Sequence, residues 1–356
     1  MSTSIKPGIP WLDTNGNRIQ AHGGSIFYEN DTYYWYGENK EKTKPGNGIW
    51  HWGVRAYSSK DLYNWKDEGL ILPPDENEES SPLHPSQSMD RPHILYNDRT
   101  RQYVMWVKIM GTPAGDAKYY IQYMTIAVAD RFLGPYKIIK TIHPLGMNSG
   151  DFDLVQNESD HKVYIYFERV HSELICADLT DDYLDVTGYY SSHFPRPQPP
   201  FVREAPAFFT RKGSMYLFSS GTTGYFPNPS EVAVSKLFHG PWTLLGDPHI
   251  NDPSHTSFHS QITSVFKHPK KKDLYIALAD RWLTDLTGKT PDMRPIFEAM
   301  FNPEKRSLLT KEDKDALNLS IQDTSKADYV WLPVRFTEDG RPFIEWLDEW
   351  KTEDYE

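Results

Sequence analysis

Polar side chains stand at the start of several apolar, strand-like segments of this chain. Glu204 precedes small residues and the apolar pair Phe208-Phe209. The other segments start at Gln20-Ala21-His22, Asp90, Asp151 and Gln261. Successive starts are separated by roughly 50 to 70 residues, the length of one four-stranded β-propeller blade with its loops. Because the first strand of each blade lines the propeller axis, we expect these side chains to converge on one pocket.

Three of these side chains are carboxylates: Asp90, Asp151 and Glu204. Like charges and desolvation both raise the pKa of a carboxyl group, so such a cluster is costly and typical of a functional site. The alternative is that some of them pair with Arg91 and Arg203, their neighbours in sequence. Convergent carboxylates near aromatic residues suit glycoside hydrolysis, in which one acid protonates the leaving oxygen and a second group activates water.

Strand-like segments separated by turn signals fill most of the chain, and the unit recurs five times. We therefore predict an all-β fold, a single five-bladed β-propeller over residues 1–356. A β-sandwich is the alternative, but it leaves turns such as Gly134-Pro135-Tyr136 unexplained. Residues 73–88 are predicted to connect two blades, and residues 290–327 to form a polar, partly helical insertion in the last blade. The first residues are expected to help to close the ring, because an open ring leaves a sheet edge unpaired.

Composition narrows the possible partners and cofactors. The net charge of -11 argues against nucleic-acid and anionic-membrane partners. Cys176 is the only cysteine, which excludes an internal disulfide and a thiolate metal cluster. No cofactor is expected, and no spacing predicts a metal site. The first residues lack the apolar core of a signal peptide, so a cytoplasmic protein is expected, although a secreted protein trimmed of its leader would look the same.

Several motifs together resemble glycoside hydrolase family 43, and more closely its exo-β-1,3-galactanase-type branch. They cover nearly the whole chain in the expected order: Ile19-Gln20-Ala21-His22-Gly23-Gly24, Tyr33-Tyr34-Trp35-Tyr36-Gly37-Glu38, Asp90-Arg91-Pro92-His93, Ser149-Gly150-Asp151, Arg203-Glu204-Ala205-Pro206-Ala207, Ser260-Gln261 and Tyr329-Val330-Trp331-Leu332-Pro333. The resemblance implies a five-bladed propeller, an oligosaccharide substrate and an inverting mechanism.

The resemblance also implies catalytic roles. Glu204 matches the general acid, and Asp151 matches the carboxylate that tunes the pKa of that acid and holds it in place. The usual base is an Asp at the head of the first blade, but His22-Gly23 stands there and no carboxylate is present. In the galactanase-type branch a Gln of the fifth blade is the proposed base, and Gln261 matches it. As the base, Gln261 is expected to face Glu204 across a bound monosaccharide. That role needs the imidic tautomer of the amide, or a water held by Gln261 and activated elsewhere.

Further candidates would bind the sugar. Asp90 stands where the branch more often has Glu to contact sugar hydroxyls, and Arg91 follows it. Glu38 is a further hydroxyl ligand, or else a solvated strand end. Aromatic candidates for stacking on a sugar ring are Trp52, with its neighbours Trp50 and His51, and Trp282. The alternative is that these side chains only pack inside the protein. His22 and His259 are candidates to hold a water or an ion on the axis.

The leading hypothesis is an exo-acting hydrolase that removes terminal β-linked galactose from β-1,3-galactan or arabinogalactan-derived oligosaccharides. The shorter side chain of Asp90 leaves other family 43 activities open, namely α-L-arabinofuranosidase, β-galactofuranosidase or β-xylosidase. A catalytically silent carbohydrate-binding propeller is a rival of another class, because the usual Asp base is missing. A glycoside phosphorylase ranks last, since no basic cluster extends beyond Arg91 and Arg203.

Overall fold

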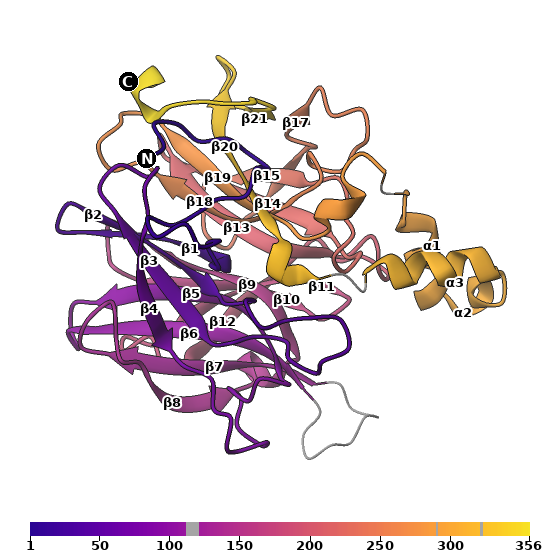
Figure 1. Cartoon of the computed structure of the whole chain (residues 1–356), viewed down its shortest axis with the longest axis horizontal. Helices are drawn as coiled ribbons and strands as arrows, with labels where there is room; N and C mark the ends of the chain where they lie inside the picture. Colours follow the sequence, from indigo (N-terminus) through magenta and orange to yellow (C-terminus); the bar gives the residue numbers. More distant parts are fainter. Residues whose placement is uncertain (112–120, 290, 321–322) are drawn as a thin grey trace.

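The computed structural model describes residues 1–111, 121–289, 291–320 and 323–356, and their strands form five sheets (Figure 1). Within these residues, four of the sheets have four strands each, and the fifth has one strand more. Apart from the extra strand of the fifth sheet, strands that follow one another along the chain within a sheet pair as antiparallel neighbours. The chain is therefore a five-bladed β-propeller, as predicted.

The strands of the first three blades follow the sequence without interruption. The first blade contains β1 (His22–Glu29), β2 (Thr32–Glu38), β3 (Val54–Ser59) and β4 (Lys66–Leu72). The second contains β5 (Ser88–Asn97), β6 (Gln102–Gly111), β7 (Ile121–Ala129) and β8 (Lys137–Ile142). The third contains β9 (Ser149–Gln156), β10 (Val163–Arg169), β11 (Glu173–Leu179) and β12 (Val186–His193). Residues 73–87 connect the first two blades, which confirms the predicted connection apart from Ser88, the first residue of β5.

The last two blades share one short strand. The fourth blade contains β13 (Arg203–Arg211), β14 (Ser214–Gly221), β15 (Glu231–Ser235) and β16 (Thr243–Gly246). The fifth contains β18 (Gln261–Lys267), β19 (Tyr275–Arg281), β20 (Asp328–Phe336) and β21 (Pro342–Glu345). Between them, β17 (His249–Ile250) pairs in parallel with β21, so the end of the fourth blade covers the outer edge of the fifth.

The first strand of each blade lies at the centre of the ring. Along the ring, β1 packs beside β5 and β18, whereas β13 packs beside β9 and β18. The first blade is therefore a direct neighbour of the second and fifth blades, and the fourth blade is a direct neighbour of the third and fifth. Side chains at the start of β1 and of β13 consequently face the axis from different sides.

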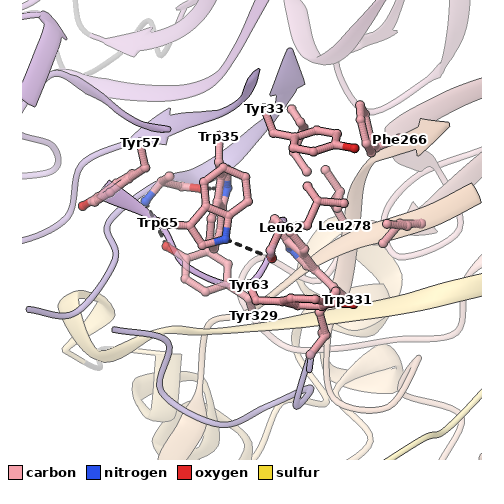
Figure 2. Packing of buried hydrophobic residues seen from close by; sticks show 14 of the residues in the cluster. Tyr33, Trp35, Tyr57, Leu62, Tyr63, Trp65, Phe266, Leu278, Tyr329 and Trp331 are labelled. Carbon is pink, nitrogen blue, oxygen red and sulfur yellow. Dashed lines mark hydrogen bonds between the residues drawn. The ribbon is translucent and has the colours of Figure 1, made fainter. Parts of the chain in front are cut away.

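Aromatic side chains join the first blade to the last (Figure 2). Trp35 on β2 and Trp331 on β20 have ring centroids 4.3 Å apart, and Trp65 packs edge-on against both. Such pairs contribute about 0.5–1.5 kcal/mol each beyond the area that they bury. The first residues also take part in closure, because Ile5 exchanges backbone hydrogen bonds with Trp350. The propeller is thus closed by packed aromatic side chains and by the backbone hydrogen bonds between the two ends of the chain.

Three helices project from one side of the ring (Figure 1). They are α1 (Arg294–Phe301), α2 (Pro303–Arg306) and α3 (Lys311–Leu317), and they lie between β19 and β20. Thr310 begins α3 with a capping box, in which its side chain accepts from the Asp313 N–H and Asp313 accepts in return. Residues 290 and 321–322 of the predicted insertion lie outside the described residues. Of the helices in the described ranges, none is long and apolar enough to cross a membrane.

Candidate active site

A cavity of about 720 Å³ lies where the inner strands of the blades begin. Its size is within the range of small-ligand sites. The carboxyl groups in its wall come from four blades: Glu38, Asp90, Asp151, Glu168 and Glu204. Aromatic side chains from loops and from α1 complete it: Trp50, Tyr225, Phe226, Trp282, Phe297 and Phe301. The cavity therefore combines convergent carboxylates with apolar rings, as a sugar site requires.

Glu204 is directed at the cavity by an irregularity at the start of β13. The register between β13 and β14 shifts between Glu204 and Ala207, and Ala205 has a φ of +50°. Pro206 lies inside this bulge and has no N–H to donate to the ladder, so regular pairing cannot continue through it. Bulges of this kind re-aim side chains next to active sites.

The pKa of Glu204 lies well above that of an ordinary glutamate. Burial makes the largest contribution to this higher pKa, and the negative charges of Asp151 and Glu168 raise it further. The cations Arg91 and Lys108 lower the pKa but do not outweigh these effects. Glu204 can therefore stay protonated near neutral pH, which a general acid requires.

Asp151, in contrast, is held ionised by two cations. Lys108 Nζ lies 2.7 Å from Oδ1 of Asp151, and Arg91 Nε lies 2.9 Å from its Oδ2. Burial raises the pKa of Asp151, but the charges of Arg91 and Lys108 outweigh it and bring the pKa down to about 2. A permanent negative charge is thus fixed beside Glu204, and it favours the protonated form of that acid.

The two arginines that flank the predicted carboxylates behave differently. Arg91 forms an ion pair, but with Asp151 of the next blade and not with its sequence neighbour Asp90, so the expected pairing between neighbours in sequence is not the one that forms. Arg203 turns away from the cavity wall: it donates to the backbone and hydroxyl oxygens of Ser219, and its Nε lies 3.5 Å from Glu231. Glu204 is therefore not neutralised by its neighbour in sequence.

Glu38 and Asp90 are the cavity carboxyl groups of the first and second blades. Both oxygens of Asp90 have partners, since Trp50 Nε1 donates to Oδ1 at 2.9 Å and Lys108 Nζ lies 3.0 Å from Oδ2. Glu38 is only 1% exposed, and its Oε2 lies 3.1 Å from Nζ of Lys40. Lys40 in turn donates to the Trp50 carbonyl and lies over the Trp50 ring, which fixes the loop after β2.

Glu168 and Lys108 are cavity residues that the sequence analysis did not single out. They stand near the ends of β10 and β6, the second strands of their blades. Because first and second strands are antiparallel, the end of a second strand lies beside the start of a first strand. The pairs His22 with Glu38, Asp90 with Lys108, Glu204 with Ser220 and Gln261 with Asp280 show this. A charged residue ending an apolar second strand is therefore the signal that points to this cavity.

The position of Gln261 differs from the one expected. A base would face Glu204 across a bound monosaccharide, but Gln261 Nε2 donates directly to Glu204 Oε1 at 3.1 Å and to Ser220 Oγ at 2.8 Å. Gln261 Oε1 accepts from the Arg91 guanidinium. The physical reason is that β18 is the direct neighbour of β13, so the two side chains share one side of the cavity. The expected geometry for Gln261 is therefore wrong.

Of the other residues predicted to bind the substrate, Trp282 lies in the cavity wall, His22 lies behind it and Trp52 lies outside it. Trp282 lines the cavity and stands between it and His22, whose ring lies 5.2 Å away. His22 is fully buried, stacks on Tyr329 and contacts Asp280 through Nδ1 at 2.9 Å, so it supports the wall from behind. Trp52 is not part of the wall, because Lys42 covers its ring at 3.3 Å. In that loop Trp50 is the residue that reaches the cavity.

In the described part of the chain, no group of three or more His, Cys, Asp or Glu side chains is arranged to hold a metal ion. His259, which was considered together with His22 for the axis, accepts at Nε2 from the Gly288 N–H. The two histidines thus have partners in different parts of the fold: strands β19 and β20 for His22, and the segment at Gly288 for His259.

The model of glycosyl hydrolases family 43 matches residues 19–293 of this chain, which contain the whole set of cavity carboxylates. The chain belongs to glycosyl hydrolase family 43. It is therefore a glycoside hydrolase with a carbohydrate substrate, and inversion at the anomeric carbon is the outcome of the family 43 reaction. The match ends at residue 293, directly before α1.

Solved structures of family 43 enzymes share this architecture. One β-1,3-galactosidase is 29% identical with a TM-score of 0.79, over 100% of this chain and 65% of that protein. Another, bound to galactodeoxynojirimycin, is 28% identical with a TM-score of 0.76, over 98% and 100%. An exo-β-1,3-galactanase from Clostridium thermocellum is 27% identical with a TM-score of 0.73, over 98% and 66%. This chain thus spans about two thirds of the first and third proteins. No curated protein matches it significantly in sequence.

Proposed function

We propose that this family 43 enzyme is an exo-acting inverting hydrolase that releases terminal β-linked galactose from β-1,3-galactan or arabinogalactan-type oligosaccharides. The observation that carries the proposal is the likeness, along nearly the whole chain, to β-1,3-galactosidases, one of them bound to galactodeoxynojirimycin. The cavity lined by the polar side chains at the strand starts would then hold one galactose unit.

Glu204 is the general acid of this proposal. Its carboxyl group lines the cavity, and its raised pKa keeps the proton that the leaving oxygen must receive. Asp151 acts through Glu204, because its charge, fixed by Lys108 and Arg91, favours the protonated acid. Gln261 orients the Glu204 carboxyl group through the hydrogen bond to Oε1.

An exo mode is supported by what surrounds the cavity. Residues 43–50 border it on one side, and Phe297 and Phe301 of α1 border it on another. Lys44 ties the first of these borders to the segment directly before β20, because its Nζ lies 2.9 Å from Asp323 and 2.6 Å from the Ser325 hydroxyl. Walls on several sides favour the end of a sugar chain over its middle.

A panel of substrates tests the proposal. The enzyme is incubated with β-1,3-galactooligosaccharides and with aryl glycosides of galactose, arabinofuranose, galactofuranose and xylose, and products are followed over time by chromatography. We expect galactose as the only early product of the oligosaccharides and the aryl β-galactopyranoside as the best aryl substrate. Early internal fragments, or a preference for a pentoside, would overturn it. A preference for a pentoside would instead support one of the other family 43 activities that the short Asp90 side chain leaves open.

A further inference from the structure

Inversion needs a base on the side of the sugar ring opposite the acid, and the displacement of Gln261 leaves that role open. Resting on the reaction proposed above, we propose that Glu38 is the general base that activates the attacking water. Five carboxyl groups line the cavity. The base must belong to a blade that is not a direct neighbour of the Glu204 blade, and it must have an oxygen available to a water.

Asp90 and Asp151 have no oxygen to spare. In each of them, both carboxylate oxygens lie within 3.0 Å of a cationic or indole nitrogen: Trp50 and Lys108 for Asp90, Lys108 and Arg91 for Asp151. A carboxylate already bound in this way is a weak proton acceptor, since protonation costs it those charge-assisted contacts. Both groups therefore hold Lys108 and Arg91 in place.

Glu168 stands on the same side as the acid. It belongs to the third blade, whose inner strand β9 is the direct neighbour of β13, and its negative charge raises the pKa of Glu204. Its Oε1 accepts the His171 backbone N–H at 2.8 Å. A water bound at Glu168 would approach the sugar from the face that the acid protonates, so inversion would not result.

Glu38 meets both requirements. It comes from the first blade, whose inner strand β1 neighbours β5 and β18, while Glu204 comes from the fourth blade. Lys40 Nζ forms an ion pair with Oε2 of Glu38 at 3.1 Å, and neither oxygen of Glu38 accepts a hydrogen bond from a residue that the structure describes. Glu38 Oε1 lies 3.2 Å from the point where a Cβ on Gly23 would stand, so the missing side chain at position 23 leaves this oxygen open.

The reaction then balances as a single displacement. Glu38 takes one proton from a water as the water oxygen bonds to the anomeric carbon, and the bond from that carbon to the leaving oxygen breaks. The leaving oxygen takes the proton of Glu204. One water is consumed, Glu38 ends protonated and Glu204 ends ionised, and a proton exchange with solvent restores both.

The pH dependence of this base follows from the groups around it. Lys40 at the end of β2, Asp90 on β5, Asp280 on β19 and the cross-strand neighbour His22 on β1 face Glu38. Burial raises the pKa of Glu38 most, Lys40 lowers it, and Asp90 and Asp280 raise it, with a net result well above an ordinary glutamate. Activity should therefore fall on the acid side as pH drops through that pKa and Glu38 takes up a proton.

Azide rescue tests the proposal, using the full chain and an aryl β-galactopyranoside with a good leaving group. We expect Glu38→Ala to lose hydrolysis by roughly 10²- to 10⁴-fold. Added azide should then restore turnover and form α-galactosyl azide, because a small anion can replace the activated water in the vacated space. Glu38→Gln should lose hydrolysis similarly, and its residual activity should lack the acid limb. Its melting temperature should fall, because Lys40 loses its buried counter-charge. Glu338→Gln, in the exposed turn between β20 and β21, is the matched control.

Three results would overturn the assignment: Glu38→Ala within threefold of the parent, α-galactosyl azide from Gln261→Ala instead, or loss of hydrolysis in folded Glu38→Ala without any azide product. The last would mark Glu38 as a positioning residue. The parent is assayed first, so that a failure of the proposed substrate is seen separately. If another aryl glycoside is cleaved, the same variants and the same azide assay are run on that glycoside.

Discussion

The floor of the cavity and its rim are built from different parts of the fold. The floor consists of side chains near the starts of first strands and the ends of second strands: Glu38, Asp90, Lys108, Asp151, Glu168 and Glu204. The rim consists of residues 43–50 and the α1 side chains Phe297 and Phe301. Floor residues are mostly charged and are fixed by the sheets, whereas the rim is largely loop and helix.

This difference suggests separate roles, with the reaction at the floor and the recognition of further sugar units at the rim. The family 43 model covers every floor residue and stops directly before α1. In this chain α1 reaches across to other blades, since Phe301 packs edge-on against His171 at 4.8 Å and Gln198 donates to the Glu298 carbonyl. We infer that the floor performs the family reaction, and that the rim of this particular chain decides which sugar follows the cleaved one.

The largest expected effect is at the floor, in Glu204→Gln. The amide keeps the size of the side chain but cannot donate the proton, so kcat on galactobiose should fall by about 10³-fold or more. An aryl galactoside whose leaving group needs no proton should lose much less. Steady-state kinetics on both substrates measure this contrast, and an equal loss on both would remove Glu204 from the role of acid.

Asp151→Asn should have the next largest effect. It removes the charge that helps to raise the pKa of Glu204 and leaves Arg91 and Lys108 less neutralised, and both changes lower that pKa. Glu204 then loses its proton at lower pH, so the basic limb of the kcat/KM profile should move to lower pH, with a loss of about 10- to 100-fold at neutral pH. A basic limb that stays in place would show that Asp151 does not act through Glu204.

The sequence allowed the ring and much of the floor to be predicted. Alternating apolar strands with Gly-Pro turns specify blades, and blade geometry alone places Asp90, Asp151 and Glu204 around one cavity. Side-chain contacts across the ring depend on three-dimensional packing that spacing does not encode. The hydrogen bond from Gln261 to Glu204 is one case, and the choice of Trp50 over Trp52 in a loop without a regular period is another. Lys108 and Glu168 could also have been predicted, because the end of an antiparallel second strand lies beside the start of the first strand of its blade.

The smallest expected effect belongs to the rim. Phe297→Ala and Phe301→Ala each remove an aromatic face worth about 1 kcal/mol of stacking, so KM for galactotriose should rise about fivefold. Both kcat and the kinetics on the aryl galactoside should stay unchanged, because the floor is untouched. Leu308→Ala is the control, an exposed residue of the same insertion that lies outside the cavity. A fall in kcat on the aryl substrate would contradict the division between floor and rim.

The most direct test of the account is an NMR time course of β-1,3-galactobiose hydrolysis, recorded before mutarotation equilibrates the product. An acid on one side of the sugar and a base on the other predict that the α-anomer of galactose appears first, and that its share then falls to the equilibrium value. Initial release of the β-anomer, or no galactose from this substrate at any enzyme concentration, would contradict it.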